Sequence, residues 1–146
     1  MANTCLTSVA AVVAVGVIAA VAPVGRSEPG PSSWRVPAGE AGKKNPISPD
    51  DKSVARGKEI YSKNCLDCHG QAGKGDGRKS AELKPKPRDL SSPDVAGESD
   101  GALYWKITEG RRPMPTFRKL LSDEERWHVV NYVRTFHPKG QTPKGN

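Results

Sequence analysis

The amino-acid sequence predicts an all-α domain of three to four short helices, and three observations lead to this prediction. Apolar residues recur at three- and four-residue spacing near residues 54–61 and again near residues 129–136. No segment gives a strong signal for a β-strand, which would alternate apolar and polar residues. Apolar residues make up only 35% of the 146-residue chain, so a core made of side chains alone would be sparse. A bound group that fills the interior is therefore expected.

The first 25 residues are predicted to direct export. Residues 1–25 carry no charged side chain, and residues 9–24 are almost wholly apolar, which is typical of a signal peptide or an N-terminal membrane anchor. Ala20 and Ala22 favour cleavage by a signal peptidase, whereas Pro23 directly after them opposes it. Both alternatives predict a protein of the periplasm or of the outer face of the cytoplasmic membrane.

Composition sets the expected boundaries of the domain. Residues 26–48 contain four prolines and three glycines without apolar periodicity, so they are predicted to form a flexible tether. Within it, Trp34 either docks on the domain or stays solvated. The domain itself is expected over residues 49–138, and residues 139–146 are predicted to be a disordered tail.

The first helix of the domain is expected to begin with Ser48 as N-cap and Pro49 at the first helical position, followed by acidic residues in the first turn. The segment 70–97 is rich in glycine and proline and is predicted to be a long loop. A loop of this length is unusual in a small domain unless it wraps around a bound group.

Two further helices follow this loop. A short helix is expected from about Ser99 to Glu109, with Gly110 ending it. The last helix begins with Ser122, and Glu125 three residues later completes a capping box. Its apolar stripe continues to residue 136, and a proline follows its end.

A cluster of cysteine and histidine carries the predicted chemistry. The chain contains three cysteines, and Cys5 belongs to the predicted leader. The other two stand in the run Cys-Leu-Asp-Cys-His at residues 65–69, where a disulfide across so short a gap would be strained. Two thiols at this spacing can instead add to the two vinyl groups of a haem, and His69 can then ligate the iron. The run predicts one haem c, bound covalently through Cys65 and Cys68.

A zinc site and a redox-active dithiol are the alternatives for this run. A structural zinc needs four ligands, and beyond the run only His128 and His137 offer an imidazole, at a spacing that fits no zinc finger. A thioredoxin-like dithiol belongs to a framework of strands and helices, whereas a helix is expected before Cys65. Both alternatives are disfavoured.

A second axial ligand is expected to come from Met114. It is the only methionine besides the initiator, and it lies between Pro113 and Pro115, which stiffen the loop around it. A stiff loop can hold a thioether at one position over the iron. The competing ligands are His128 and His137, and a methionine that merely fills the core is the structural alternative. The predicted iron ligands are therefore His69 and Met114.

These residues resemble the small class I c-type cytochromes over residues 50–137. The resemblance rests on Gly57, Tyr61 and the run at residues 65–69, together with the following glycine-rich loop, the Met114 loop and the last helix. It implies the cytochrome c fold, in which short helices wrap around one covalently bound haem. It also implies that the first and last helices cross where Gly57 meets Tyr132.

The resemblance also concerns the surroundings of the haem. In the family, the ligating histidine donates its other ring N–H to the carbonyl of a proline, which fixes the ring. Pro85 and Pro87 are both candidates for this role. The partners of the haem propionates are open, with Arg88, Trp105 and Arg111 as candidates.

The predicted function is one-electron transport in an exported electron-transport chain, with no catalytic residues and no enzyme activity. Two protein ligands leave the iron no position for a substrate. One alternative is a tethered haem subunit of a membrane oxidoreductase complex. A less favoured alternative is a haem-based ligand sensor, which would need an open sixth position.

The charge balance predicts the partner. Lysine and arginine number 23 and aspartate and glutamate 16, so the net charge is +7. We expect redox partner proteins with acidic docking surfaces, a possible membrane tether, and neither nucleic acid nor a small-molecule substrate. The cations expected around the haem are Lys84, Lys86, Arg88, Arg111, Arg112, Arg118 and Lys119.

Overall fold

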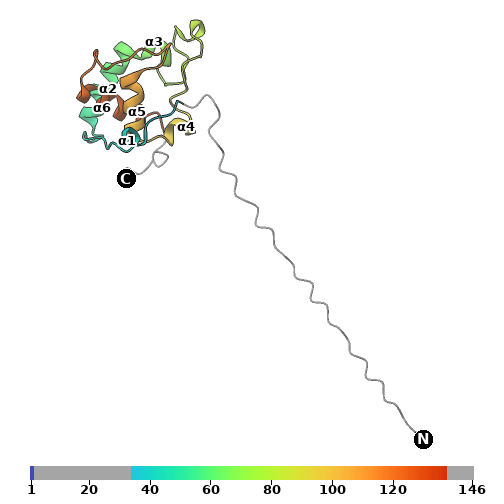
Figure 1. Ribbon diagram of the computed structural model, residues 1–146. Helices are drawn as coiled ribbons and strands as arrows, with labels where there is room; N and C mark the ends of the chain where they lie inside the picture. The colour runs from blue at the N-terminus through green and yellow to red at the C-terminus, as the bar shows by residue number, and fades with distance from the viewer. Residues whose placement is uncertain (2–33, 138–146) are drawn as a thin grey trace. The chain divides into compact units, whose positions relative to one another are not determined.

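Short helices joined by turns make up the part of the chain that the computed structural model describes, which is Met1 and residues 34–137. No strand occurs among these residues, where the only β-type pairing is an isolated bridge between Arg111 and Met114. The predicted all-α fold is confirmed. The elements, shown in Figure 1, are α1 (Ala38–Ala41), α2 (Asp51–Asn64), α3 (Leu66–His69), the 3₁₀ turn η1 (Ser80–Glu82), α4 (Pro93–Ala96), α5 (Asp100–Glu109) and α6 (Asp123–Arg134).

The three longer helices are those that the sequence predicts, and their caps are local. In α6, Ser122 accepts a hydrogen bond from the backbone N–H of Glu125 at 3.1 Å, and the Glu125 carboxylate accepts one from the Ser122 N–H at 3.0 Å. This is the predicted capping box. Ser99 caps α5 by accepting from the N–H of Ala102 at 3.2 Å, and Gly110 ends that helix with a φ of 64°.

The start of α2 differs from the prediction. Asp50, and not Ser48, is the N-cap, and its carboxylate accepts from the Ser53 N–H at 2.8 Å. The reason is a contact with the last helix. The Asn131 amide donates to the carbonyls of Ile47 and Ser48 at 3.2 and 3.3 Å, so these two residues are held against α6 and the helix begins after them.

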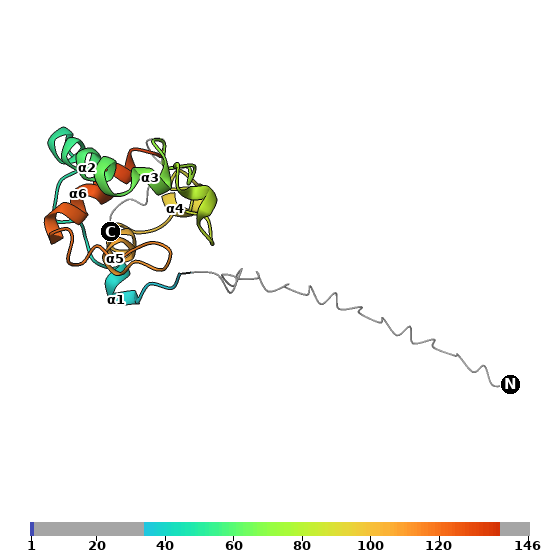
Figure 2. The same cartoon turned by 90° about the horizontal axis from the view of Figure 1, so that it is seen from above.

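The contact between α2 and α6 is the most extensive between helices in the described domain, and the two helices lie side by side in both views (Figures 1 and 2). Gly57 makes this contact possible. A Cβ atom at Gly57 would lie 2.0 Å from the carbonyl oxygen of His128 and 2.8 Å from the Cβ of Tyr132. The pairing of Gly57 with Tyr132 that the resemblance implies is therefore present.

Residues 34–47, which we call the N-terminal strap, pack on the domain. The Asn45 amide donates to the Asn131 side chain at 2.7 Å, and the Ser99 hydroxyl donates to the Ala41 carbonyl at 2.6 Å. Helix α1 of the strap lies beside α5 in Figures 1 and 2. A Cβ atom at Gly101 would lie 2.3 Å from the carbonyl oxygen of Glu40. The compact unit thus begins at Trp34, earlier than the boundary predicted at residue 49.

Several sequence-based expectations fall outside the described residues. The predicted leader beyond Met1, residues 26–33 of the predicted tether, and the tail at 139–146 are among them. Within the described part of the chain, no helix combines the length and the apolar character that a membrane span requires.

Candidate functional site

The cysteine and histidine run forms one turn of helix directly after α2. The N–H of Cys65 donates to the Tyr61 carbonyl at 2.8 Å and caps α2, while the N–H groups of Cys68 and His69 donate back to the Cys65 carbonyl at 3.1 and 2.9 Å. These bonds form α3 and bring both thiols to one end of a cavity. Neither thiol is in a disulfide, which agrees with the strain expected for so short a gap.

The loop after α3 folds back on the same turn. The N–H groups of Gly75 and Gly77 donate to the carbonyls of His69 and Cys68 at 2.9 and 3.2 Å. A Cβ atom at Gly77 would lie 2.4 Å from the Asp67 carbonyl oxygen, so only glycine fits there. The loop thus holds α3 in position through backbone hydrogen bonds.

The His69 ring is oriented by a backbone carbonyl. Its Nδ1 lies 3.2 Å from the carbonyl oxygen of Arg88, and because a carbonyl can only accept, Nδ1 carries the proton and Nε2 keeps its lone pair. The resemblance implied the carbonyl of a proline in this role, with Pro85 and Pro87 as candidates. Both prolines line the cavity, but the bond goes to the residue after them. Burial lowers the pKa of His69, so the ring is neutral and ready to ligate.

The environment of Cys65 differs from that of a redox-active thiol. Burial, and then the neighbouring Cys68 thiol, raise the pKa of Cys65 to about 12. A dithiol oxidoreductase needs the opposite, because the thiolate is the reactive form and its pKa is lowered in such sites. The dithiol alternative therefore loses support.

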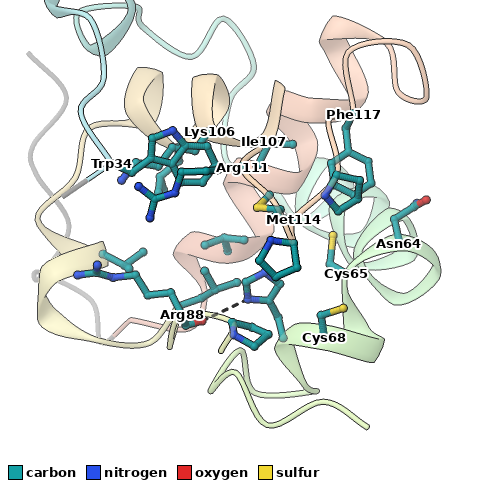
Figure 3. A pocket seen from close by; sticks show the side chains of 18 of the residues that line it. Trp34, Asn64, Cys65, Cys68, Arg88, Lys106, Ile107, Arg111, Met114 and Phe117 are labelled. Atoms are coloured by element: carbon teal, nitrogen blue, oxygen red, sulfur yellow. Dashed lines mark hydrogen bonds between the residues drawn. The ribbon is translucent and has the colours of Figure 1, made fainter. Parts of the chain in front are cut away.

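Met114 faces the cavity from a turn between α5 and α6. Its N–H donates to the Arg111 carbonyl at 2.9 Å, and Pro113 and Pro115 flank it as the sequence suggested. Figure 3 shows the sulfur atoms of Met114, Cys65 and Cys68 around the same space. The fold thus brings Met114 to the same cavity as Cys65, Cys68 and His69, which precede it in the sequence by more than 40 residues.

Apolar side chains from several elements form the walls. They come from α4, α5 and α6, from the loop after α3 and from the loop between α5 and α6, and include Leu83, Leu90, Val95, Leu103, Ile107, Phe117, Val129 and Val133. An apolar cavity of this extent in a small domain costs stability unless it is filled. The lining fits a flat, largely apolar group that can bond covalently to two thiols and can be ligated by an imidazole and a thioether. A haem c is such a group.

The competing ligands lie elsewhere. His128 does not line the cavity, and its Nδ1 is 2.8 Å from the hydroxyl of Ser53. His137 is buried at the end of the described chain but does not line the cavity either. Among the residues described, no group of three or more histidine, cysteine and carboxylate side chains is placed to hold a metal ion.

The charged residues expected around the site are partly gathered there. Lys86, Arg88, Arg111 and Arg112 line the cavity, and all four are exposed. The Arg88 guanidinium is paired with Asp94 at 2.8 Å. Trp105 does not line the cavity, whereas Trp34 does. The position of Trp34 is not predictable from the sequence, because it depends on a contact with Trp105, which lies 71 residues later in the chain.

Comparison with known proteins gives a consistent result. Residues 52–133 match a family model described as cytochrome c oxidase, cbb3-type, subunit III. The chain is 30% identical over 93 residues to a cytochrome bc1 complex cytochrome c subunit of Corynebacterium diphtheriae, which is 63% of this chain and 30% of that protein. It is 28% identical over 80 residues to cytochrome c6 of Diacronema lutheri, which is 55% of this chain and 92% of that protein.

A solved structure is also similar. A chain of the Kuenenia stuttgartiensis reducing HAO-like protein complex superposes with a TM-score of 0.58 at 35% sequence identity, over 64% of this chain and 47% of that one. The chain therefore spans less than half the length of that protein and of the corynebacterial subunit.

Proposed function

Because the chain belongs to the family of cbb3-type cytochrome c oxidase subunit III and is a class I c-type cytochrome with a covalently bound haem, we propose that it carries one electron on an iron ligated by His69 and Met114. Cys65 and Cys68 form the two thioether bonds in this proposal. The observation that carries it is the convergence of an imidazole, a thioether and two thiols on one apolar cavity (Figure 3).

The proposed roles follow from the surroundings of each residue. The haem iron, when bound, supplies a one-electron couple. His69 presents Nε2 to the cavity because the Arg88 carbonyl holds Nδ1. Met114 would supply the second protein ligand to the iron in this proposal. Two protein ligands would leave no position for a substrate or a gas, which disfavours both an enzyme and a sensor. The apolar walls exclude water, and exclusion of water together with a methionine ligand raises the reduction potential.

An absorption spectrum of the oxidised and reduced protein tests this proposal. We expect the spectrum of a covalent haem, with the weak far-red band of methionine bound to ferric iron in the oxidised form. Met114→Ala should abolish that band and let the reduced protein bind carbon monoxide. His128→Ala is the matched control, because it changes the imidazole that does not line the cavity. Loss of the band in His128→Ala, and not in Met114→Ala, would reverse the ligand assignment.

The exposed cations at the cavity support docking of an acidic redox partner. Lys86 and Arg112 line the cavity, are exposed, and form no ion pair within residues 34–137. Charges in this position accelerate association with an acidic surface, and the acceleration falls as salt is raised. We expect Lys86→Gln and Arg112→Gln to reduce the salt dependence of the electron-transfer rate. Lys58→Gln, on the exposed part of α2 outside the cavity, should leave it unchanged. Equal effects of all three would contradict docking at this face.

Membership of a larger redox complex is the second candidate function. It is favoured by the names of two similar proteins, one a subunit of a cytochrome bc1 complex and one a chain of an HAO-like complex. In this case the domain still transfers one electron, and catalysis takes place in another chain. Copurification of the protein with membrane proteins after a high-salt wash would favour the complex, whereas recovery as a single chain would favour the free carrier.

The proposed location is the periplasm or the outer face of the cytoplasmic membrane. It rests on the uncharged apolar sequence of residues 1–25 as a signal peptide or anchor. Mass spectrometry of the purified protein tests it. A mature chain that begins near residue 23 identifies a cleaved leader, an intact chain in the membrane fraction identifies an anchor, and an intact chain in the cytoplasm would contradict export.

A further inference from the structure

The N-terminal strap contributes an aromatic wall to the cavity, although it precedes the family domain at residues 52–133. Trp34 lines the cavity. Its ring packs against Trp105 of α5 in an edge-to-face arrangement, with 6.1 Å between the ring centroids and 62° between the planes. The hydrogen bonds of Asn45 and Ser99 described above hold the rest of the strap on α5 and α6. Trp34 is therefore part of a fixed wall.

Two cations lie near the Trp34 ring, and they differ in their partners. The guanidinium carbon of Arg111 is 5.0 Å from the ring centroid, and the Lys106 ammonium is 5.8 Å from it. Lys106 is already paired with the Glu98 carboxylate at 2.5 Å. Arg111 has no carboxylate within ion-pair distance among residues 34–137. The Trp34 ring thus positions the Arg111 guanidinium at the cavity, and no carboxylate of the described residues is paired with that guanidinium.

The other end of the cavity carries the two thiols. In Figure 3, Trp34 and Arg111 lie at one end and Cys65 and Cys68 at the other, with Met114 between them. In a haem, the two vinyl groups and the two propionates occupy opposite sides of the macrocycle. If the thiols bond to the vinyl groups, as the proposed function has it, the propionate carboxylates point to the end where Arg111 lies. The following inference rests on that orientation.

We propose that Arg111 binds a haem propionate and that Trp34 of the N-terminal strap is the positioning residue that holds the Arg111 guanidinium for it. A guanidinium and a carboxylate form charge-assisted, often bidentate hydrogen bonds. The face of an indole ring attracts and orients the guanidinium plane, and this reduces the rotamer freedom that binding would otherwise remove. The strap therefore completes the cofactor site from outside the family domain.

The remaining charged groups of the cavity serve this role less well. The Arg88 guanidinium is bound to Asp94, and the Lys106 ammonium to Glu98. Lys86 is exposed and has no aromatic partner among the cation–π contacts of the described residues. Arg112, the neighbour of Arg111, likewise lines the cavity and has no such partner. Arg112 is therefore a matched control, with the same charge in the same loop.

The reduction potential of the full-length haem protein tests the role of Arg111. Loss of a cation that neutralises a propionate favours the more positive, oxidised iron. We expect Arg111→Gln to lower the potential, Arg111→Lys to restore part of the loss, and Arg112→Gln to cause a clearly smaller shift. Equal shifts in Arg111→Gln and Arg112→Gln, or no restoration by lysine, would overturn the inference.

A double-mutant comparison tests whether Trp34 acts through Arg111. We expect Trp34→Ala to lower the potential in the same direction, and Arg111→Gln to add less in that background than in the wild type. Trp34→Phe keeps an aromatic face and should stay close to the wild type. Additive shifts would overturn the positioning role.

The same samples separate this inference from the proposed function. An intact far-red methionine band in every variant, together with unchanged potentials, would overturn the propionate assignment alone. A wild-type protein without that band, or without covalent haem, would instead overturn the proposed ligation.

Discussion

The contact at Gly57 allows a prediction whose magnitude can be worked out from the structure. Gly57→Ala adds a methyl group that would lie 2.0 Å from the His128 carbonyl oxygen, whereas ordinary contacts begin at 3.4 Å. The difference means that α2 and α6 must separate by about 1.4 Å where they cross. The nearest atom is part of the backbone, so no side-chain rotation relieves the clash.

The expected net effect is a destabilisation of about 2 kcal/mol. Overpacking of this kind destabilises a protein by about 1–3 kcal/mol, and contact with a helix backbone puts the destabilisation near the upper value. Replacing glycine by alanine inside a helix offsets about 1 kcal/mol of this, because alanine loses less backbone entropy on folding. Separation of α2 and α6 also moves Val129 and Val133, which line the cavity, so we expect the haem spectrum to change slightly.

Urea unfolding of the oxidised haem protein, followed by far-ultraviolet circular dichroism, measures this effect. Gly39→Ala in α1 is the control, because a Cβ atom there meets nothing within 4 Å, and it should be neutral or stabilise by up to about 1 kcal/mol. A Gly57→Ala protein as stable as the wild type would refute the close approach of α2 and α6.

Three further predictions concern α6 and the cofactor. Because the Ser122 N–H lowers the pKa of Glu125, this carboxylate stabilises α6 above its ordinary pKa of 4.5 and the contribution is lost as the pH falls through the lowered value. Ser122→Ala should lower the free energy of unfolding by about 1 kcal/mol at neutral pH. Glu125→Gln should make the free energy of unfolding depend less on pH in the acid range. If neither variant changes the dependence of stability on pH, the capping box is contradicted. Arg126→Met should lower the free energy of unfolding in urea by about 3 kcal/mol. The reason is that the buried guanidinium donates to the Leu121 carbonyl and to the Tyr104 hydroxyl at 2.6 and 2.9 Å. A loss below about 0.5 kcal/mol would refute a stabilising role for these hydrogen bonds. The chain made without haem should show no cooperative unfolding by circular dichroism, whereas a sharp transition would mean that the core is complete without it.

Local signals predicted the helices that carry their own caps. Ser99 with Gly110 and the capping box of α6 lie within a few residues of the helices they limit, so the sequence displays them directly. The N-cap of α2 was misplaced by two residues, because Asn131 of a distant helix fixes the chain before it. The single turns α1, α4 and η1 have no periodicity to reveal them.

More of the candidate site than of the surrounding fold could be predicted from the sequence. The run at residues 65–69 and Met114 are recognisable from residue type and spacing alone, and the structure places them on one cavity. Which carbonyl orients His69 depends on the path of the loop over residues 70–97, which spacing does not determine. Residues 34–47 were predicted to be tether and the position of Trp34 could not be predicted, because the space that Gly101 leaves for α1 is visible only in three dimensions.

The pairing of α2 with α6 also bears on biosynthesis. These two helices stand near the beginning and the end of the domain, and Val129 and Val133 of α6 form one wall of the cavity. A growing chain presents its cysteines long before it can present that wall. A premature stop codon after residue 69 and before residue 123 therefore removes the wall that α6 contributes to the pocket while leaving both attachment cysteines in place. The nascent domain acquires a complete pocket only when its last helix has been made.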